Sequence, residues 1–183
     1  MIEKIPYVKT ELELLPVKSE VLQSGQLNDE VVRRLHSVIE CEGPITRELL
    51  LKRVINSFDI YKVGWRVNEY FKTVLTDFVK YARDEQGVCV YHCENERQNC
   101  FRPDTKRFRF SHQIPPCEGA NVIVKVLEDS SKRLKKDPVY YAFIAELGYK
   151  KSGSDLKELF RKSLKYALDS GLVTKTRSCT YHI

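Results

Sequence analysis

The sequence predicts a mainly α-helical protein with small β-ribbons, an α+β fold in which two similar domains follow one another. The first observation is an internal repeat, because residues 31–82 align with residues 120–171 at a constant offset of 89 positions. A repeated apolar pattern at helical spacing reports a repeated core, and two copies are too few for a solenoid. The matched pairs are Leu35 with Val124, Val38 with Leu127, Ile55 with Ile144, Phe58 with Leu147, Gly64 with Gly153, Val67 with Leu156, Phe71 with Phe160 and Leu75 with Leu164.

The second observation is that each copy has the pattern of three helices joined by short turns. In the first copy, apolar residues over 31–39 predict a helix that Gly43-Pro44 ends. Residues 49–55 carry the apolar stripe of a second helix. Gly64 then marks the turn before a longer third helix, whose core positions lie between residues 67 and 78.

The third observation is a set of short β-rich segments after the helices. Val88–Tyr91 predicts a strand, and Phe108–Phe110 predicts a returning strand. In the second copy, residues 172–175 and 179–183 predict a shorter hairpin. Three helices followed by a β-ribbon indicate two tandem winged helix-turn-helix-like domains. The predicted boundaries are an extended N-terminal arm over 1–27, a first domain over 28–113 and a second domain over 114–183.

Positive charge is concentrated in the second half of the chain. Residues 1–100 carry 14 Lys/Arg and 16 Asp/Glu, whereas residues 101–183 carry 17 and 9. A polyanion suits such a half, because neutralising phosphates releases counterions. Isolated surface lysines often serve only to solvate a helix face. The asymmetry favours nucleic acid because it coincides with a fold that commonly binds it.

The predicted third helices are the surfaces that a helix-turn-helix protein places against DNA. Lysine and arginine suit phosphate contacts, and only Arg66 and Asn68 suit base edges. Because Glu69 and Glu158 share these faces and repel phosphate, we expect binding directed at the DNA backbone. The predicted nucleic-acid-binding residues are Lys62, Arg66, Asn68 and Lys72 in the first copy, Arg102, Lys106, Arg107 and Arg109 in the returning wing, and Lys150, Lys151, Lys157, Arg161 and Lys165 in the second copy.

Trp65, the only tryptophan, follows the turn glycine of the first copy. We expect it to cap the core beneath the third helix. The alternative is an exposed indole that stacks on a base or contacts a protein partner.

Other kinds of site find little support. Lys150–Ser154 lacks the glycine frame of a nucleotide-binding loop, and no serine or cysteine lies in a nucleophile context, so we expect no enzyme activity and no small-molecule substrate. Residue types that bind zinc gather in one segment, at Cys89, His92, Cys93 and Cys100. Their spacing lacks paired knuckles, so we expect ordinary thiols and neither a metal nor a cofactor.

The chain has no apolar run of the roughly 18 residues that a membrane span needs, and no signal-peptide pattern. We therefore expect a cytoplasmic protein with reduced cysteines and no membrane partner.

Several motifs resemble a known family. Glu42-Gly43-Pro44-Ile45 and the turn over Tyr61–Val67 are similar to motifs in a domain of unknown function near the C-terminus of large bacterial and archaeal superfamily I helicase-like proteins. Ile114-Pro115-Pro116 and Gly148–Gly153 also match that pattern, and the resemblance covers roughly residues 28–175. Thr46 departs from it, since the family usually has histidine there, and the chain lacks the helicase motor.

We expect a non-catalytic nucleic-acid-binding module, with duplex or junction DNA as the partner, that serves a helicase motor in cis or in trans. The alternative is a protein–protein interaction module that docks onto a helicase or another partner, which the acidic first copy fits better. A continuous basic stripe favours DNA. An exposed apolar patch around Trp65, Tyr70 or Tyr140-Tyr141 favours a protein.

Overall fold

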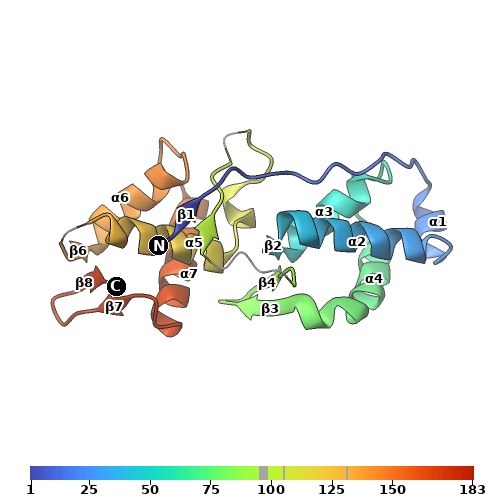
Figure 1. Ribbon diagram of the computed structural model, residues 1–183. Coiled ribbons are helices and arrows are strands. Elements are labelled where there is room, and N and C mark those ends of the chain that lie inside the picture. Colours follow the sequence, from blue (N-terminus) through green and yellow to red (C-terminus); the bar gives the residue numbers. More distant parts are fainter. Residues whose placement is uncertain (95–98, 105, 131) are drawn as a thin grey trace. The chain divides into compact units, whose positions relative to one another are not determined.

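Figure 1 shows the computed structural model, which describes residues 1–94, 99–104, 106–130 and 132–183. The fold is mixed α+β, as predicted, with helices predominating and small sheets beside them. Among the described residues, every helix is too short or too polar to span a lipid bilayer.

The chain forms two compact units, which we describe separately. The N-terminal unit comprises Val8–Arg83 and Cys89–Glu96, and the C-terminal unit comprises Met1–Tyr7, Asp84–Val88 and Arg97–Ile183. The predicted arm is therefore divided between the units instead of standing apart.

The N-terminal unit is built around the first copy of the repeat. Its elements are α1 (Ser19–Gln23), α2 (Asn28–Glu42), β2 (Ile45–Thr46), α3 (Arg47–Asn56), α4 (Trp65–Val74), the 3-10 helix η1 (Leu75–Tyr81), β3 (Ala82–Glu85) and β4 (Val88–Tyr91). β3 and β4 form a hairpin, and the tip of this hairpin, Asp84–Val88, belongs to the C-terminal unit.

Local sequence signals explain where these helices begin and end. Gly43 follows the last residue of α2, as predicted, and the Thr46 side chain caps α3 by accepting a hydrogen bond from the Leu49 N–H at 3.4 Å. Gly64 is the residue before α4, and the third helix tightens into η1 after Val74.

The three-stranded sheet of this unit has the order β2-β4-β3, with Ile45 opposite Tyr91. The predicted strand at Val88–Tyr91 is confirmed as β4, but its hairpin partner is β3 and not Phe108–Phe110, which forms no strand. Gln86 and Gly87 both have positive φ, at 56° and 77°. Two such residues make the tight turn that two-residue hairpins favour.

The C-terminal unit contains the second copy. Its elements are β1 (Glu3–Lys4), β5 (Cys100–Phe101), the 3-10 helix η2 (Ser111–Gln113), α5 (Pro116–Glu128), β6 (Leu134–Lys135), α6 (Lys136–Glu146), α7 (Ser154–Asp169), β7 (Thr174–Lys175) and β8 (Thr180–His182).

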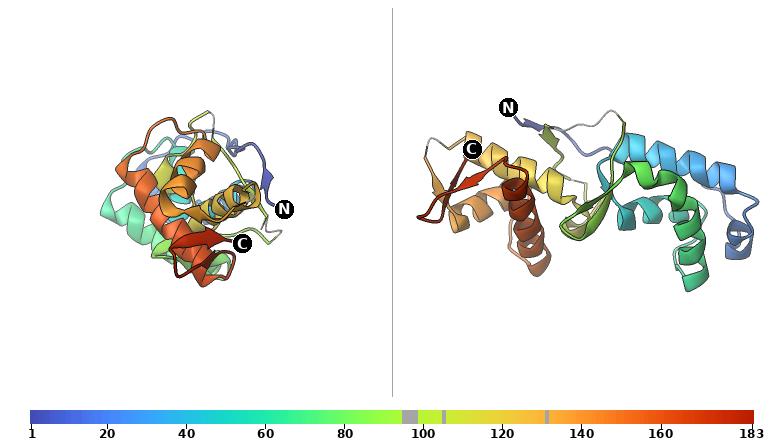
Figure 2. Two further views of the ribbon diagram at one scale, coloured as in Figure 1. Left: turned by 90° about the vertical axis from the view of Figure 1, so that its left-hand side faces the viewer. Right: turned by 90° about the horizontal axis from the view of Figure 1, so that it is seen from below.

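The predicted C-terminal hairpin is confirmed as β7 and β8, which join β6 in a sheet of order β6-β8-β7. β1 pairs in parallel with β5, so the first residues of the chain lie in this unit. The further views in Figure 2 show α7 crossing α5, its most extensive helical partner.

The repeat is visible in the structure. β6, α6 and α7 begin 89 residues after β2, α3 and α4, respectively. All seven matched apolar pairs are buried in both units. The two units therefore share a core pattern, as the repeat predicted.

Gly119 tests how tightly α5 packs on α7. A Cβ at this position would clash with the Oγ of Ser163, which is fully buried on α7. Alanine is the better helix former by about 1 kcal/mol, so any loss of stability in Gly119→Ala reports this contact. We expect a net loss of about 1–3 kcal/mol, measured by urea unfolding.

The control is the double variant Gly119→Ala/Ser163→Ala, which removes the nearest clashing atom. It should recover part of the lost stability. An equal loss in both variants would show that the α5–α7 contact is not the cause.

Candidate nucleic-acid interface

One basic surface of the C-terminal unit is the exposed face of α7. Its apolar stripe, which includes Leu156 and Phe160, packs into the core, and the opposite face points to solvent. Helical periodicity thus places the exposed cations together. They are Lys157, Arg161 and Lys165, with Lys162 half-buried beside them.

Two carboxylates on α7 moderate this charge. Glu158 accepts two hydrogen bonds from Arg161, both 2.7 Å long, and lies 3.8 Å from the Lys162 Nζ. Asp169 accepts a hydrogen bond from Lys165 at 2.7 Å. These bonds lower the pKa of both carboxyl groups, so both are ionised at neutral pH. In the described part of the chain, Lys157 has no carboxylate partner.

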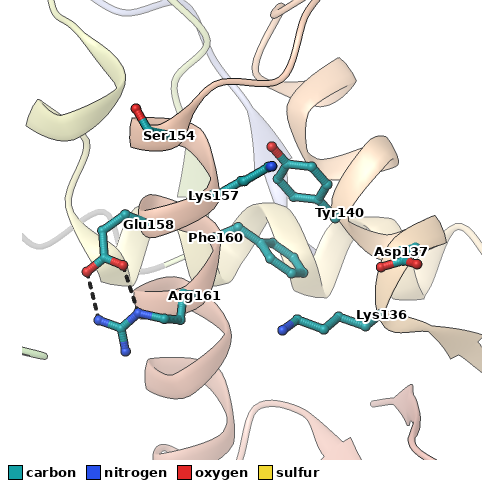
Figure 3. A pocket seen from close by; sticks show the side chains of 8 residues that line it. All are labelled: Lys136, Asp137, Tyr140, Ser154, Lys157, Glu158, Phe160 and Arg161. Atoms are coloured by element: carbon teal, nitrogen blue, oxygen red, sulfur yellow. Dashed lines mark hydrogen bonds and ion pairs between the residues drawn. The ribbon is translucent and has the colours of Figure 1, made fainter.

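A cavity of about 540 Å³ lies between α6 and α7 (Figure 3). The Lys136 and Lys157 side chains reach into the space between the two helices, and Tyr140 and Phe160 form its aromatic floor, with ring centroids 5.1 Å apart. The Tyr140 hydroxyl is 2.6 Å from the Ser152 hydroxyl. The complete lining is Lys136, Asp137, Tyr140, Ser154, Lys157, Glu158, Phe160 and Arg161.

The turn before α7 adds further positive charge. Lys150 and Lys151 are exposed there and, among the described residues, neither forms an ion pair. The predicted residues of the second copy therefore lie on one turn and one helix. This arrangement offers exposed cations along one turn and one helix face.

The four cations predicted in the returning wing differ in exposure, so they do not form one surface. Lys106 and Arg107 are exposed, but Arg102 and Arg109 are only 2% and 4% exposed. Both guanidiniums bind the buried Glu118 carboxylate, at 2.8 Å for Arg102 and at 2.5 and 2.9 Å for Arg109. Because they are enclosed, we do not include Arg102 and Arg109 in the candidate interface.

Burial alone would raise the pKa of Glu118, but the two guanidiniums outweigh burial and lower it to about 2. Tyr7 covers the cluster, its ring centroid lying 5.3 Å from the Arg102 guanidinium and 4.2 Å from that of Arg109. This cluster is structural, and sequence spacing alone could not distinguish its arginines from exposed ones.

The predicted residues of the first copy lie on and before α4, in the N-terminal unit. Lys62, Arg66, Asn68 and Lys72 are all exposed. Lys72 pairs with Glu69 at 2.5 Å. The predicted residues of this unit therefore lie together on one turn and one helix, as those of the second copy do on α7 and the turn before it.

Trp65 corrects an expectation. It does not cap the core, because 72% of its surface is exposed, and the Arg66 guanidinium lies 5.6 Å from its ring centroid.

Of the residue types that bind zinc, Cys89, His92 and Cys93 lie in the N-terminal unit and Cys100 in the C-terminal unit.

Comparison with known proteins gave no match to a family model, a curated protein or a solved structure. The resemblance to the helicase-associated domain therefore stays a prediction, and the functional argument rests on geometry and charge.

The Glu118 cluster predicts a specific pH dependence. Because the folded pKa is about 2 and the ordinary value is 4.5, the stabilisation is complete above pH 4.5 and is lost as the pH falls from 4.5 towards 2. It amounts to roughly 3 kcal/mol for a buried group with this shift. Glu118→Gln should abolish that acid-dependent loss and destabilise the C-terminal unit by about 3–5 kcal/mol at pH 7.

Hydrogen-exchange mass spectrometry on peptides from α5 and α7 would measure this in the correct unit. The matched control is Glu146→Gln, since Glu146 makes a solvent-exposed ion pair with Lys4 and should change protection little. Unchanged protection of α5 in Glu118→Gln would contradict the assigned role.

Proposed function

We propose that this chain is a non-catalytic DNA-binding module that holds the phosphate backbone with the exposed face of α7. The observation that carries the proposal is the concentration of positive charge in the unit that contains α7. The C-terminal unit has 19 Lys/Arg and 12 Asp/Glu, a net charge of +7, whereas the N-terminal unit has 12 and 13, a net charge of −1.

The order of elements supports a winged helix-turn-helix assignment for both units. The N-terminal unit runs helix, strand, helix, helix and hairpin, with sheet order β2-β4-β3. The C-terminal unit repeats that order with β6-β8-β7. In this proposal α4 and α7 are the third helices, which such domains place against DNA.

The chemistry of α7 favours phosphates over base edges. Lys157, Arg161 and Lys165 are long, exposed cations that neutralise backbone charge, and Lys150 and Lys151 extend the same charge onto the preceding turn. Glu158 would repel phosphate, and it also occupies the Arg161 guanidinium that could otherwise bind guanine. Binding of this kind is sensitive to salt and tolerant of sequence.

The biological setting follows only from the sequence resemblance. In that setting the module serves a superfamily I helicase motor, in the same polypeptide or on a separate chain, by holding duplex or junction DNA. The module itself contributes no chemistry.

A second candidate function is docking onto a protein. It is favoured by the N-terminal unit, which is slightly acidic overall and exposes Tyr61, Val63 and Trp65 by 69%, 43% and 72%. Exposed apolar side chains that lie together are typical of interaction surfaces.

The test of the main proposal is fluorescence anisotropy of a labelled DNA duplex over a salt series. The triple variant Lys157→Ala/Arg161→Ala/Lys165→Ala should bind more weakly at every salt concentration. Its slope of log K against log salt should be shallower by about 2–3, since each lost phosphate contact removes about 0.9.

The matched control is Lys9→Ala/Lys18→Ala/Lys52→Ala, which removes the same charge from exposed positions of the N-terminal unit. It should keep the slope of the unmodified protein. An equal change in both triple variants would show that net charge alone, and not the α7 face, accounts for binding. No binding to duplex at low salt would refute the proposal.

A further inference from the structure

Trp65 is exposed where an indole normally would not be. It is the only tryptophan in the chain and the first residue of α4, and 72% of its surface faces solvent. Tryptophan is highly buried on average because its apolar surface is large. Such exposure at the start of a helix points to a surface that is open to a ligand.

The neighbours of Trp65 extend this surface. Tyr61 and Val63 are exposed in the preceding turn, and a Cβ built on Gly64 would meet nothing within 4 Å. Lys62 and Arg66 are exposed cations on the same segment, with Arg66 lying 5.6 Å from the Trp65 ring centroid. We call Tyr61, Lys62, Val63, Trp65 and Arg66 the Trp65 platform.

The acidic groups near the platform are occupied. Asp59 accepts a hydrogen bond from the Tyr61 hydroxyl, which raises the pKa of Tyr61. Glu69 pairs with Lys72. In the described part of the chain, Lys62 and Arg66 have no carboxylate partner, so their charge remains available although the unit as a whole is slightly acidic.

The second copy of the repeat lacks this platform. At the offset of 89, Lys150 replaces Tyr61, Ser154 replaces Trp65 and Asp155 replaces Arg66. The C-terminal unit therefore has no aromatic residue at these aligned positions, and Tyr149, which precedes Lys150, is half-buried. An exposed indole beside exposed cations is found at this position in the N-terminal unit and not in its counterpart.

Aromatic rings beside cations are the combination that binds single-stranded nucleic acid, because bases stack on the rings while the cations contact phosphates. Bases inside a duplex already stack on each other, so their faces are closed to an indole. An apolar protein partner would bury Trp65 and Val63 but would leave Lys62 and Arg66 facing it without a counter-charge. The charge therefore favours a polyanion.

We propose that the Trp65 platform binds unpaired bases of single-stranded DNA by stacking, with Lys62 and Arg66 on the flanking phosphates. This inference rests on the proposed DNA-binding function and deepens it. It assigns unpaired bases to the N-terminal unit and backbone phosphates to α7.

The single tryptophan makes the proposal directly measurable, because intrinsic tryptophan fluorescence reports on Trp65 alone. The full chain is titrated with a thymidine oligonucleotide while anisotropy of labelled strand is recorded in parallel. We expect the emission to be quenched and to saturate together with anisotropy. A blunt duplex, and an abasic strand with the same number of phosphates, should bind without quenching.

Variants separate stacking from charge. Trp65→Ala should weaken binding of the oligonucleotide by about five- to a hundredfold and leave duplex binding unchanged, and Trp65→Phe should restore most of the loss. The matched control is Val79→Ala, which removes another exposed apolar side chain from the same unit and should have no effect.

The outcomes distinguish the two proposals. Binding by anisotropy without quenching, or unchanged single-strand affinity in Trp65→Ala, would overturn the stacking proposal and leave α7 as the DNA-binding surface. Equal quenching by blunt duplex would overturn the assignment to unpaired bases. Failure of both duplex and single strand to bind at low salt would remove both proposals and leave protein docking.

Discussion

The C-terminal unit depends on one buried carboxylate. Glu118 accepts hydrogen bonds from the Arg102 N–H and from the guanidiniums of Arg102 and Arg109. These bonds fix the irregular segment after β5 to α5, and Tyr7, which lies against both guanidiniums, fixes the start of the chain to the same place.

Because α7 packs across α5, the position of the candidate interface also depends on this buried cluster. A buried ion cluster of this kind adds little net stability over an apolar core of the same shape, but it makes the loss of any one member costly. Two cations and one anion remain enclosed together only while the carboxylate is ionised and all its bonds are formed. The cluster therefore fixes one arrangement of the segment, and it does so with charges that are enclosed and not exposed to solvent.

The cluster also shows where prediction from sequence stops. Apolar periodicity predicted the helices, and the glycine turns predicted their ends, because both are local signals in the residues themselves. Phe108-Arg109-Phe110 alternates as a half-buried strand would, yet Arg109 is the buried member because its partner, Glu118, lies on α5. Which of four nearby cations are exposed is decided by contacts distant in sequence, and no pattern within the segment carries that information.

The prediction for Trp65 was wrong in the opposite direction, because an apolar residue expected in the core is exposed. A large aromatic residue after a turn glycine usually enters the core, but Val67 and Phe71 already fill the core-facing positions of α4. The hairpin was misassigned because Gln86 adopts a positive φ that glycine or asparagine more often supplies, which hid the turn before Val88. The predicted repeat of the core was confirmed, because packing restricts core positions to apolar residues and both copies pack the same order of elements.

The two copies share one core pattern and differ on their surfaces, and this difference bears on how the proposed DNA-binding module would work beside a helicase motor. The exposed pairs on α7, Arg161 with Glu158 and Lys165 with Asp169, are accessible to water and ions, so salt screens them and phosphates can displace them. The carboxylates remain nearby after displacement and limit how tightly the backbone is held. In the proposed function, such a surface would hold DNA without fixing its register, because none of these side chains would be committed to a base edge. The Trp65 platform is equally indifferent to sequence, since every base has a face that stacks. In the proposed function, both surfaces would therefore let the nucleic acid move past them, which suits a module that accompanies a translocating helicase.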